Sequence, residues 1–245
     1  MKGTHQRTNS EPQAKSAPKA KAYKYVAKNE KQQTLSQHIE SNKPIVLVCG
    51  FAGTGKTYTA CGKAVEMLQS GEIKRIVLMR PPEPLDGQTV GFLKGDKSDK
   101  VAPWTIQLAE YLNEMLGAAA YAQAVEDGSI CFELLETCRG RDFKNSFIIV
   151  DEAQLLTPKQ VQALTTRLSC GSKLILCGDS RQCEGKRTHN TNTSTMNKLN
   201  GITYFRSVIE HFHVDIPVVE FTIDECVRLP IVKQLLQVYE IDKWY

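Results

Sequence analysis

One run of eight residues limits what this chain can fold into. The run G-F-A-G-T-G-K-T, from Gly50 to Thr57, fits the pattern G-x-x-x-x-G-K-[ST] without a gap. The apolar stretch P-I-V-L-V-C before it is typical of a strand, and apolar residues recur at helical spacing over residues 57–68 after it. The sequence therefore predicts a strand that turns through glycines directly into a helix.

A turn of this kind is suited to holding phosphate. Its glycines let the backbone curl so that N–H groups point inward at phosphate oxygens, and the first turn of the helix adds its positive end. We expect Lys56 to reach the β and γ phosphates of a nucleotide and the Thr57 hydroxyl to ligate Mg²⁺. The alternative, a glycine-rich turn that binds nothing, is disfavoured by the flanking strand and helix. The loop residues predicted to bind the nucleotide are Gly50, Phe51, Ala52, Gly53, Thr54, Gly55, Lys56 and Thr57.

Predicted strands and helices alternate along the rest of the chain. Strands with little polar alternation, separated by helices, are typical of a parallel sheet that is covered on both faces. The predicted strands are residues 44–49, 73–79, 146–150, 172–177 and 218–222, and the predicted helices are residues 57–68, 101–116, 158–168, 202–212 and 230–239. The expected fold class is therefore α/β, with a mainly parallel sheet flanked by helices.

The basic charge of the chain is concentrated at its N-terminus. Residues 1–24 carry six Lys or Arg and one Glu, a charge of +5, so the net charge of +4 leaves about −1 for residues 25–245. This segment has few bulky apolar side chains, so we expect a disordered basic tail followed by a single folded domain. A loose basic arm can bind nucleic acid phosphates, but a solubilising leader is the more common use.

Composition also bears on the location of the chain and on its cysteines. The longest apolar runs are far shorter than the roughly 18 residues of a membrane span, and charges stand where a signal peptide would have its apolar core. We therefore expect a cytoplasmic protein without membrane contact. The eight cysteines form no C-x-x-C pair, so reduced and mostly buried thiols are expected in place of a zinc site.

A second predicted strand, F-I-I-V at residues 147–150, runs directly into Asp151 and Glu152. Taken alone, it is equally well a core strand that surfaces into water. Downstream of a phosphate-binding loop, however, hydrolysis requires an Asp that holds Mg²⁺ and a carboxylate that orients the attacking water. We therefore predict that Asp151 positions Mg²⁺ and that Glu152 activates water. The Glu favours an NTPase over a kinase of small molecules.

A third predicted strand leads into G-D-S-R-Q at residues 178–182. Gln182 could sense the γ-phosphate, because an amide group both donates and accepts hydrogen bonds. A Gly-Asp turn with a solvated Gln is the alternative, and the spacing by itself favours that alternative.

In this order, the phosphate loop, D-E-A-Q at residues 151–154 and G-D-x-x-Q at residues 178–182 resemble the nucleotide-binding core of superfamily 1 helicases, and more closely the PhoH-like ATPases. The resemblance covers roughly residues 28–240. Further segments that carry it are K-R-I-V-L-M-R-P at 74–81, G-F-L-K-G-D at 91–96, R-G-R at 139–141 and D-E-C-V-R-L-P at 224–230. It implies a P-loop NTPase with a RecA-like core.

The resemblance also implies roles for two residues outside these boxes. K-N-E-K-Q at residues 28–32 is similar to the glutamine segment of the family, so Gln32 is expected to recognise adenine and to favour ATP. Arg228 lies where the family has an arginine after its last strand, and there it would stabilise charge on the γ-phosphate within its own subunit or a neighbouring one. A surface ion pair with Asp224 is the alternative for Arg228. The family also implies a homo-oligomer such as a hexamer.

The expected function is that of an ATP-binding, Mg²⁺-dependent ATPase that couples hydrolysis to RNA or another single-stranded nucleic acid. The candidate catalytic residues are Lys56, Glu152, Gln182 and Arg228, with Arg139 and Arg141 as weaker candidates for the arginine role. A superfamily 1 helicase needs two ATPase cores and this sequence has one, so strand separation by a monomer is not expected. The alternative function is a nucleotide-dependent switch or assembly protein in stress or phosphate metabolism.

Overall fold

A six-stranded sheet forms the centre of the computed structural model, which describes residues 22–81, 97–135, 142–179 and 200–242. The strand order is β3-β2-β4-β5-β1-β6, and every neighbouring pair is parallel. The strands are β1 Ile45–Gly50, β2 Arg75–Met79, β3 Ile130–Phe132, β4 Ser146–Val150, β5 Lys173–Gly178 and β6 Val218–Phe221. The predicted α/β fold with a parallel sheet is confirmed.

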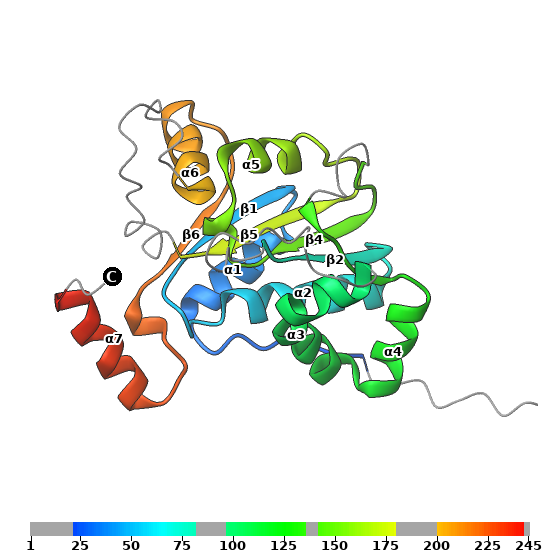
Figure 1. Ribbon diagram of the computed structural model, residues 1–245, viewed down its shortest axis with the longest axis horizontal. Coiled ribbons are helices and arrows are strands. Elements are labelled where there is room, and N and C mark those ends of the chain that lie inside the picture. The colour runs from blue at the N-terminus through cyan, green and yellow to red at the C-terminus, as the bar shows by residue number, and fades with distance from the viewer. Residues whose placement is uncertain (1–21, 82–96, 136–141, 180–199, 243–245) are drawn as a thin grey trace, which may run out of the picture.

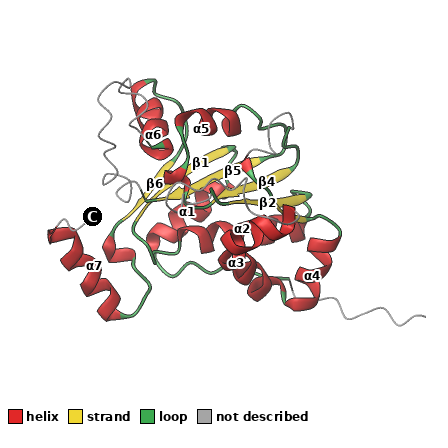
Figure 2. Ribbon diagram, viewed as in Figure 1, coloured by secondary structure: helices red, strands yellow, loops and turns green. Residues whose placement is uncertain are grey.

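Helices cover both faces of this sheet (Figures 1 and 2). Helices α1 to α4 pack on one face, and α5 and α6 pack on the other. The helices are α1 Glu30–Glu40, α2 Lys56–Ser70, α3 Lys97–Leu116, α4 Ala118–Glu126, α5 Pro158–Thr165, α6 Gly201–His211 and α7 Pro230–Asp242, with two short 3-10 turns, η3 Ala153–Leu155 and η5 Ile223–Glu225. Helix α7 lies apart from both layers, at the lower left of Figure 1.

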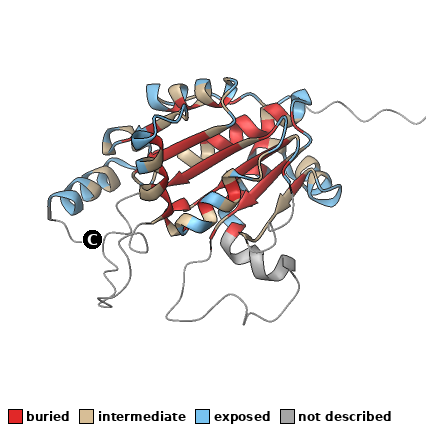
Figure 3. Ribbon diagram, turned by 90° about the horizontal axis from the view of Figure 1, so that it is seen from above, coloured by how far each residue is buried: buried red, intermediate tan, exposed pale blue. Residues whose placement is uncertain are grey.

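The strands supply the apolar side chains of two separate core layers. Successive side chains of a strand point to opposite faces, so in β1 Val46 and Val48 pack with α1 and α2, whereas Leu47 and Cys49 pack toward α5 and α6. Both faces of the central strands are buried, as Figure 3 shows. This double burial explains why the strands read as continuous apolar runs in the sequence.

All ten predicted elements are present, with ends shifted by up to four residues. Three further elements, α1, α4 and β3, are absent from the sequence-based prediction. Helix α1 buries only two large apolar side chains, Leu35 and Ile39, in a segment that is otherwise polar. Strand β3 has three residues. Two apolar side chains in α1 and three residues in β3 are too few to give a clear periodicity, so these two elements depend on the sheet and helices beside them.

The described chain begins at Ala22, so most of the predicted tail lies outside the described residues. The Tyr23 backbone N–H donates to Gln69 Oε1 at 2.8 Å, and the Tyr25 N–H donates to Glu66 Oε1 at 2.6 Å. Both acceptors are on α2, and the Tyr25 side chain is buried. Contacts with the fold therefore begin two residues before the predicted domain boundary at residue 25.

The described helices and cysteines bear on two expectations from composition. No helix in the described part of the chain combines the length and apolar character needed to cross a membrane. The six described cysteines are free thiols, but only half of them, Cys49, Cys61 and Cys177, are buried, so burial is less general than expected. Burial raises the pKa of Cys49 to about 11, so this thiol stays protonated at neutral pH.

Strand β5 lies between the strand of the phosphate loop and the acidic strand. It pairs with β1 along one side and with β4 along the other. Because all three strands are parallel, their carboxyl ends meet at one edge of the sheet, where ligands of open α/β sheets bind. Gly50, Asp151 and Gly178 stand at or directly after these ends.

Gly50 closes β1 in a conformation that side chains rarely adopt. Its φ is +135°, and a Cβ at this position would lie 2.2 Å from the backbone oxygen of Phe221 on β6. Glycine at this position therefore permits both the close approach of β6 and the start of the loop.

We predict that Gly50→Ala lowers the free energy of unfolding by about 3 kcal/mol, because backbone strain adds to a clash with a sheet carbonyl. Gly71→Ala is the matched control: its φ is +81°, but nothing lies within 4 Å of the added Cβ. It should lose only about 1 kcal/mol. Urea unfolding measures both, and equal losses would contradict the close-approach explanation.

Candidate functional site

The loop after β1 curls around the side chain of Lys56. Gly53 and Gly55 have φ values of +76° and +84°, which lets the chain turn into α2 at Lys56. The Lys56 Nζ donates hydrogen bonds to the carbonyl oxygens of Gly50 and Phe51, both at 2.7 Å. The loop thus holds an ammonium group beside the positive N-terminus of α2, an arrangement suited to phosphate.

Burial lowers the pKa of Lys56, because the ammonium loses contact with water. The negative charges of Asp179, Asp151 and Glu152 act in the opposite direction. An anion placed in the loop would add to this opposing effect and favour the charged lysine. The local electrostatics therefore fit a phosphate ligand.

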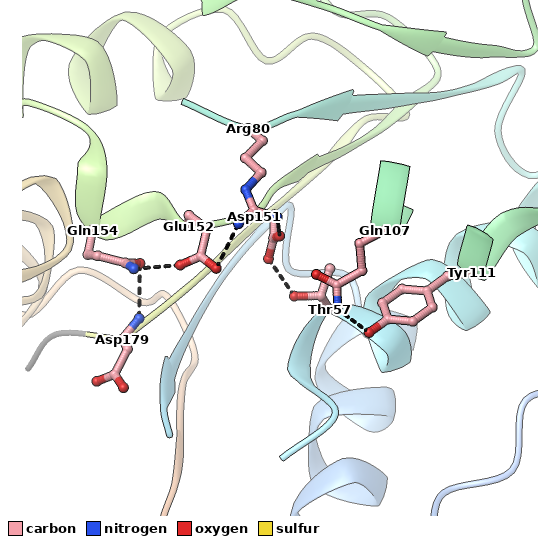
Figure 4. A network of polar contacts seen from close by, with 8 residues as sticks. All are labelled: Thr57, Arg80, Gln107, Tyr111, Asp151, Glu152, Gln154 and Asp179. Atoms are coloured by element: carbon pink, nitrogen blue, oxygen red, sulfur yellow. Dashed lines mark hydrogen bonds and ion pairs between the residues drawn. The ribbon is translucent and has the colours of Figure 1, made fainter. Parts of the chain in front are cut away.

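Asp151 follows β4 and faces Thr57 in the first turn of α2. The Thr57 Oγ1 donates to Asp151 Oδ1 at 2.6 Å (Figure 4). Burial raises the pKa of Asp151, and the hydrogen bond from Thr57 opposes that rise. A hydroxyl and a carboxylate in contact supply the oxygen ligands that Mg²⁺ prefers, so these two residues fit that ion.

Glu152 has an uncommon backbone conformation for a residue with a side chain. Its φ of 52° and ψ of 41° lie in the left-handed region, which costs about 1–2 kcal/mol and is often found at functional sites. The conformation turns the chain sharply from β4 into η3. As a result, the Asp151 and Glu152 carboxylates point to different sides, Asp151 toward Thr57 and Glu152 toward Gln154 (Figure 4).

Gln154 links the ends of β4 and β5. Its Nε2 donates to Glu152 Oε2 at 2.6 Å, and its Oε1 accepts from the backbone N–H of Asp179 at 3.0 Å. A Cβ on Gly178 would lie 2.4 Å from Gln154 Oε1, so glycine leaves room for this amide. The glutamine of the D-E-A-Q box, whose contact the sequence left unassigned, therefore holds the Glu152 carboxylate.

Arg80 directly follows β2 and contacts both carboxylates. Its Nη1 lies 3.5 Å from Asp151 Oδ2, and its Nη2 lies 3.4 Å from Glu152 Oε1. Arg80 and Asp179 stand in the segments 74–81 and 178–182 that carry the family resemblance, but the sequence predicted no role for either. The available signal was that each follows a predicted strand, but only the strand order brings both to the acidic pair.

Gln32 is buried beneath the loop, with its amide bonded to the protein. Its Oε1 accepts from the Tyr25 hydroxyl at 3.0 Å and from the Lys28 N–H at 2.9 Å, while Nε2 donates to the Thr54 carbonyl at 3.0 Å. These bonds make Gln32 a brace of the phosphate loop, and both lone pairs of its Oε1 are used. Its recognition of adenine stays a prediction.

Arg228 lies over the phosphate loop of its own chain. A Cβ on Gly53 would be 2.6 Å from Arg228 Cγ, and the Val227 N–H donates to the Gly53 carbonyl at 3.0 Å. Asp224, the alternative partner considered for Arg228, forms an ion pair with Lys233 at 3.1 Å. The segment after β6 thus places Arg228 at the loop within one subunit.

These groups surround a single cavity of about 310 Å³, within the usual size range of small-molecule sites. The Tyr58 ring packs edge-on against Tyr111 of α3 at its side, with ring centroids 5.2 Å apart. The Lys56 ammonium and the two carboxylates thus lie beside an aromatic wall. The lining residues are Val26, Lys28, Gln32, Ala52, Gly53, Gly55, Lys56, Thr57, Tyr58, Gln107, Tyr111, Asp151, Glu152, Gly178, Asp179, Val227 and Arg228.

The structure brings most of the predicted site residues together. Lys56 and Thr57 of the loop, the two carboxylates after β4, and Gln32 and Arg228 all line the cavity. Three predicted residues, Gln182, Arg139 and Arg141, lie outside the described residues. In the part of the chain that is described, no cluster of three or more His, Cys, Asp or Glu side chains forms a further metal site.

Comparison with known families and proteins gives a consistent result. The family model described as PhoH-like protein matches residues 25–240. A PhoH-like protein of Bacillus subtilis is 36% identical over 196 residues, which cover 80% of this chain and 58% of the relative. Protein PhoH of Escherichia coli K12 is 32% identical over 218 residues, covering 87% and 58%. The chain therefore spans less than two thirds of the length of these relatives.

Solved structures align with the chain at lower sequence identity. The large terminase of a thermophilic bacteriophage aligns with a TM-score of 0.49 and 14% identity, covering 85% of this chain and 49% of that one. The Pif1 helicase of Candida albicans aligns with a TM-score of 0.38 and 13% identity, covering 81% and 41%. These similarities concern the fold alone.

We predict that Gln154→Leu lowers the free energy of unfolding by about 1–3 kcal/mol, because the Asp179 N–H and Glu152 Oε2 each lose a buried partner. Gln154→Glu should cost more, since it places a second carboxylate against Glu152. Gln162→Ala, at an exposed position of α5, is the control and should stay within about 0.5 kcal/mol of the original protein. If urea unfolding gives all three variants the same stability, Gln154 does not link the strands.

Proposed function

Because the chain belongs to the PhoH-like family, we propose that it is a Mg²⁺-dependent ATP hydrolase that couples hydrolysis to RNA or another single-stranded nucleic acid. The contact between Thr57 Oγ1 and Asp151 Oδ1, 2.6 Å apart at the mouth of the phosphate loop, carries this proposal. It supports the proposal because a hydroxyl and a carboxylate oxygen, which together fit Mg²⁺, meet beside the phosphate loop. Glu152, the residue after Asp151, supplies the further carboxylate that hydrolysis requires.

The phosphate loop and the end of the acidic strand contribute different parts of the proposed binding site. Lys56 and the loop N–H groups bind the β and γ phosphates, while Thr57 and Asp151 would hold Mg²⁺. When bound, Mg²⁺ neutralises charge on the phosphate oxygens. The braced position of Gln32 supports the loop in this role, and adenine recognition by the same residue remains part of the proposal.

Glu152 is the proposed base. It accepts a proton from water as the water oxygen bonds to the γ-phosphorus, the bond from phosphorus to the bridging oxygen breaks, and ADP and inorganic phosphate leave. The hydrogen bond from Gln154 keeps the Glu152 carboxylate in one orientation during this step. Gln182 is proposed as the γ-phosphate sensor, since β5, which leads to it, lies between β1 and β4.

Arg228 is the proposed source of positive charge for the transition state. Its side chain lies over Gly53 of the same chain, which favours action within the subunit. A guanidinium there would stabilise the charge that develops on the γ-phosphate oxygens.

We predict that Glu152→Gln retains ATP binding but loses about 10²–10⁴ of the turnover, the usual contribution of a general base. Lys56→Ala should instead lose binding, because the charge at the centre of the loop is gone. Glu126→Gln, an exposed change at the end of α4, is the matched control and should hydrolyse ATP normally. Phosphate release with and without EDTA, together with nucleotide binding, measures these effects.

The same assay, repeated with single-stranded poly(U) RNA, tests the nucleic acid partner. Turnover by the original protein should rise with RNA at low salt, where phosphate contacts are strongest. Full turnover by Glu152→Gln would remove Glu152 from its role. An unchanged rate with RNA would leave an ATPase without this coupling.

A second function, a nucleotide-dependent assembly switch, is favoured by the segment that joins the loop to α7. Val227 and Arg228 contact the phosphate loop, and α7 begins two residues later. Its apolar side chains, including Ile231, Leu235 and Val238, are exposed in the described structure. Nucleotide binding could therefore reposition a helix that joins subunits of a homo-oligomer such as a hexamer.

Under this second function, a non-hydrolysable ATP analogue should increase the particle mass measured by light scattering. Leu235→Glu should prevent the increase, because it places a charge in the apolar stripe. Gln234→Glu, a change at an exposed polar position of the same helix, should not. The same mass with and without the analogue would exclude the switch.

A further inference from the structure

Arg80 reaches the acidic pair from outside the nucleotide cavity. Asp151 and Glu152 line the cavity, and Arg80 is not among the described residues that do so. Strand β2, which carries Arg80, lies on the side of β4 opposite to β5 and β1. The guanidinium therefore contacts the two carboxylates from the β2 flank, and in Figure 4 it approaches Asp151 from the side opposite Thr57.

Two side chains contact the Glu152 carboxylate, and the two contacts differ in strength. The hydrogen bond from Gln154 Nε2 to Oε2 is 2.6 Å long and comes from a residue that is only 3% exposed. The contact from Arg80 Nη2 to Oε1 is 3.4 Å long, and the Arg80 side chain is 27% exposed. The buried amide is thus a fixed support. The longer, solvent-accessible ion pair is the one that can exchange its partner.

We propose that Arg80 is a positioning residue that links a nucleic acid phosphodiester outside the cavity to the Glu152 carboxylate. This inference rests on the proposed ATPase function. Without nucleic acid, Arg80 occupies Glu152 Oε1. When a phosphodiester pairs with the guanidinium, Oε1 becomes free to accept a hydrogen bond from the attacking water, while Gln154 keeps the carboxylate in place.

The chemistry of the guanidinium favours this partner. Arginine presents a planar fork of donors that matches the oxygens of a phosphate, and it exchanges carboxylate for phosphate without losing a proton. The phosphates of a bound nucleotide are expected beside Lys56, on the other side of the carboxylates. A phosphate that reaches Arg80 from solvent therefore belongs to a different molecule, and a nucleic acid backbone supplies phosphates in a row.

The test compares Arg80→Gln, Arg80→Lys and Arg75→Gln in ATP turnover with and without poly(U). In Arg80→Gln, the kcat without RNA should rise roughly two- to fivefold, the range for one partly exposed ion pair, and poly(U) should add nothing. The KM for ATP should stay unchanged. Arg80→Lys keeps the charge without the fork, so it should retain part of the stimulation. Arg75 lies at the other end of β2, with its Nε bonded to Ser146 Oγ, so Arg75→Gln should behave as the original protein.

Three outcomes would overturn the inference. One is undiminished stimulation of Arg80→Gln by poly(U). Another is low turnover with and without RNA at unchanged thermal stability, which would make Arg80 a support for catalysis. The third is a loss of the preference for ATP over ADP, which would place the nucleotide's own γ-phosphate at Arg80. Should Arg80→Gln be unstable, the partial stimulation of Arg80→Lys decides.

Different results would contradict the proposed function and this inference. A purified original protein that releases no phosphate from ATP removes the ATPase itself. If the original protein hydrolyses ATP without a response to poly(U), and Arg80→Gln behaves in the same way, the ATPase function stands. The proposed link through Arg80 is then wrong.

Discussion

The insertion of β5 between β1 and β4 sets the dimensions of the site. With about 4.8 Å between neighbouring strands, the acidic strand lies about 10 Å from the strand of the phosphate loop. The pairings Cys49 with Gly178 and Val150 with Leu176 keep the three carboxyl ends close to one level. This gap is wide enough for phosphate oxygens and an ion. Thr57, which projects from the first turn of α2, crosses it to reach Asp151.

The charged side chains of the site balance one another through their positions more than through the numbers of cations and anions. Lys56 stands on the loop side of the carboxylates and Arg80 on the opposite side, so the acidic pair lies between two cations. Each carboxylate also accepts a short hydrogen bond from a neutral side chain, Thr57 for Asp151 and Gln154 for Glu152. These neutral donors fix the orientation of each carboxylate without weakening its charge, and a site that binds Mg²⁺ needs that charge.

The sequence predicted the features that local patterns encode. The glycine-rich turn of residues 50–57 and the apolar strand before Asp151 are each contiguous, so spacing alone located them. The contact of Arg80 with the two carboxylates could not be predicted, because it depends on β2 lying beside β4, a pairing between distant segments. The same is true of Gln154, whose amide meets a backbone N–H beyond β5. Helix α1 escaped prediction because few of its side chains are apolar, although it delivers Gln32 to the loop.

The hydroxyl of Tyr25 makes the segment before the first strand part of the nucleotide site. It donates to Gln32, which in turn donates to the Thr54 carbonyl, so two hydrogen bonds connect this segment to the loop. A fragment that keeps both hydrogen bonds must therefore include Tyr25, well upstream of β1. A fusion or proteolytic cut between residues 22 and 29 would act on the loop's support from outside the sheet. A molecule that binds the N-terminal segment would likewise act on the phosphate loop, because two hydrogen bonds connect the segment to the loop.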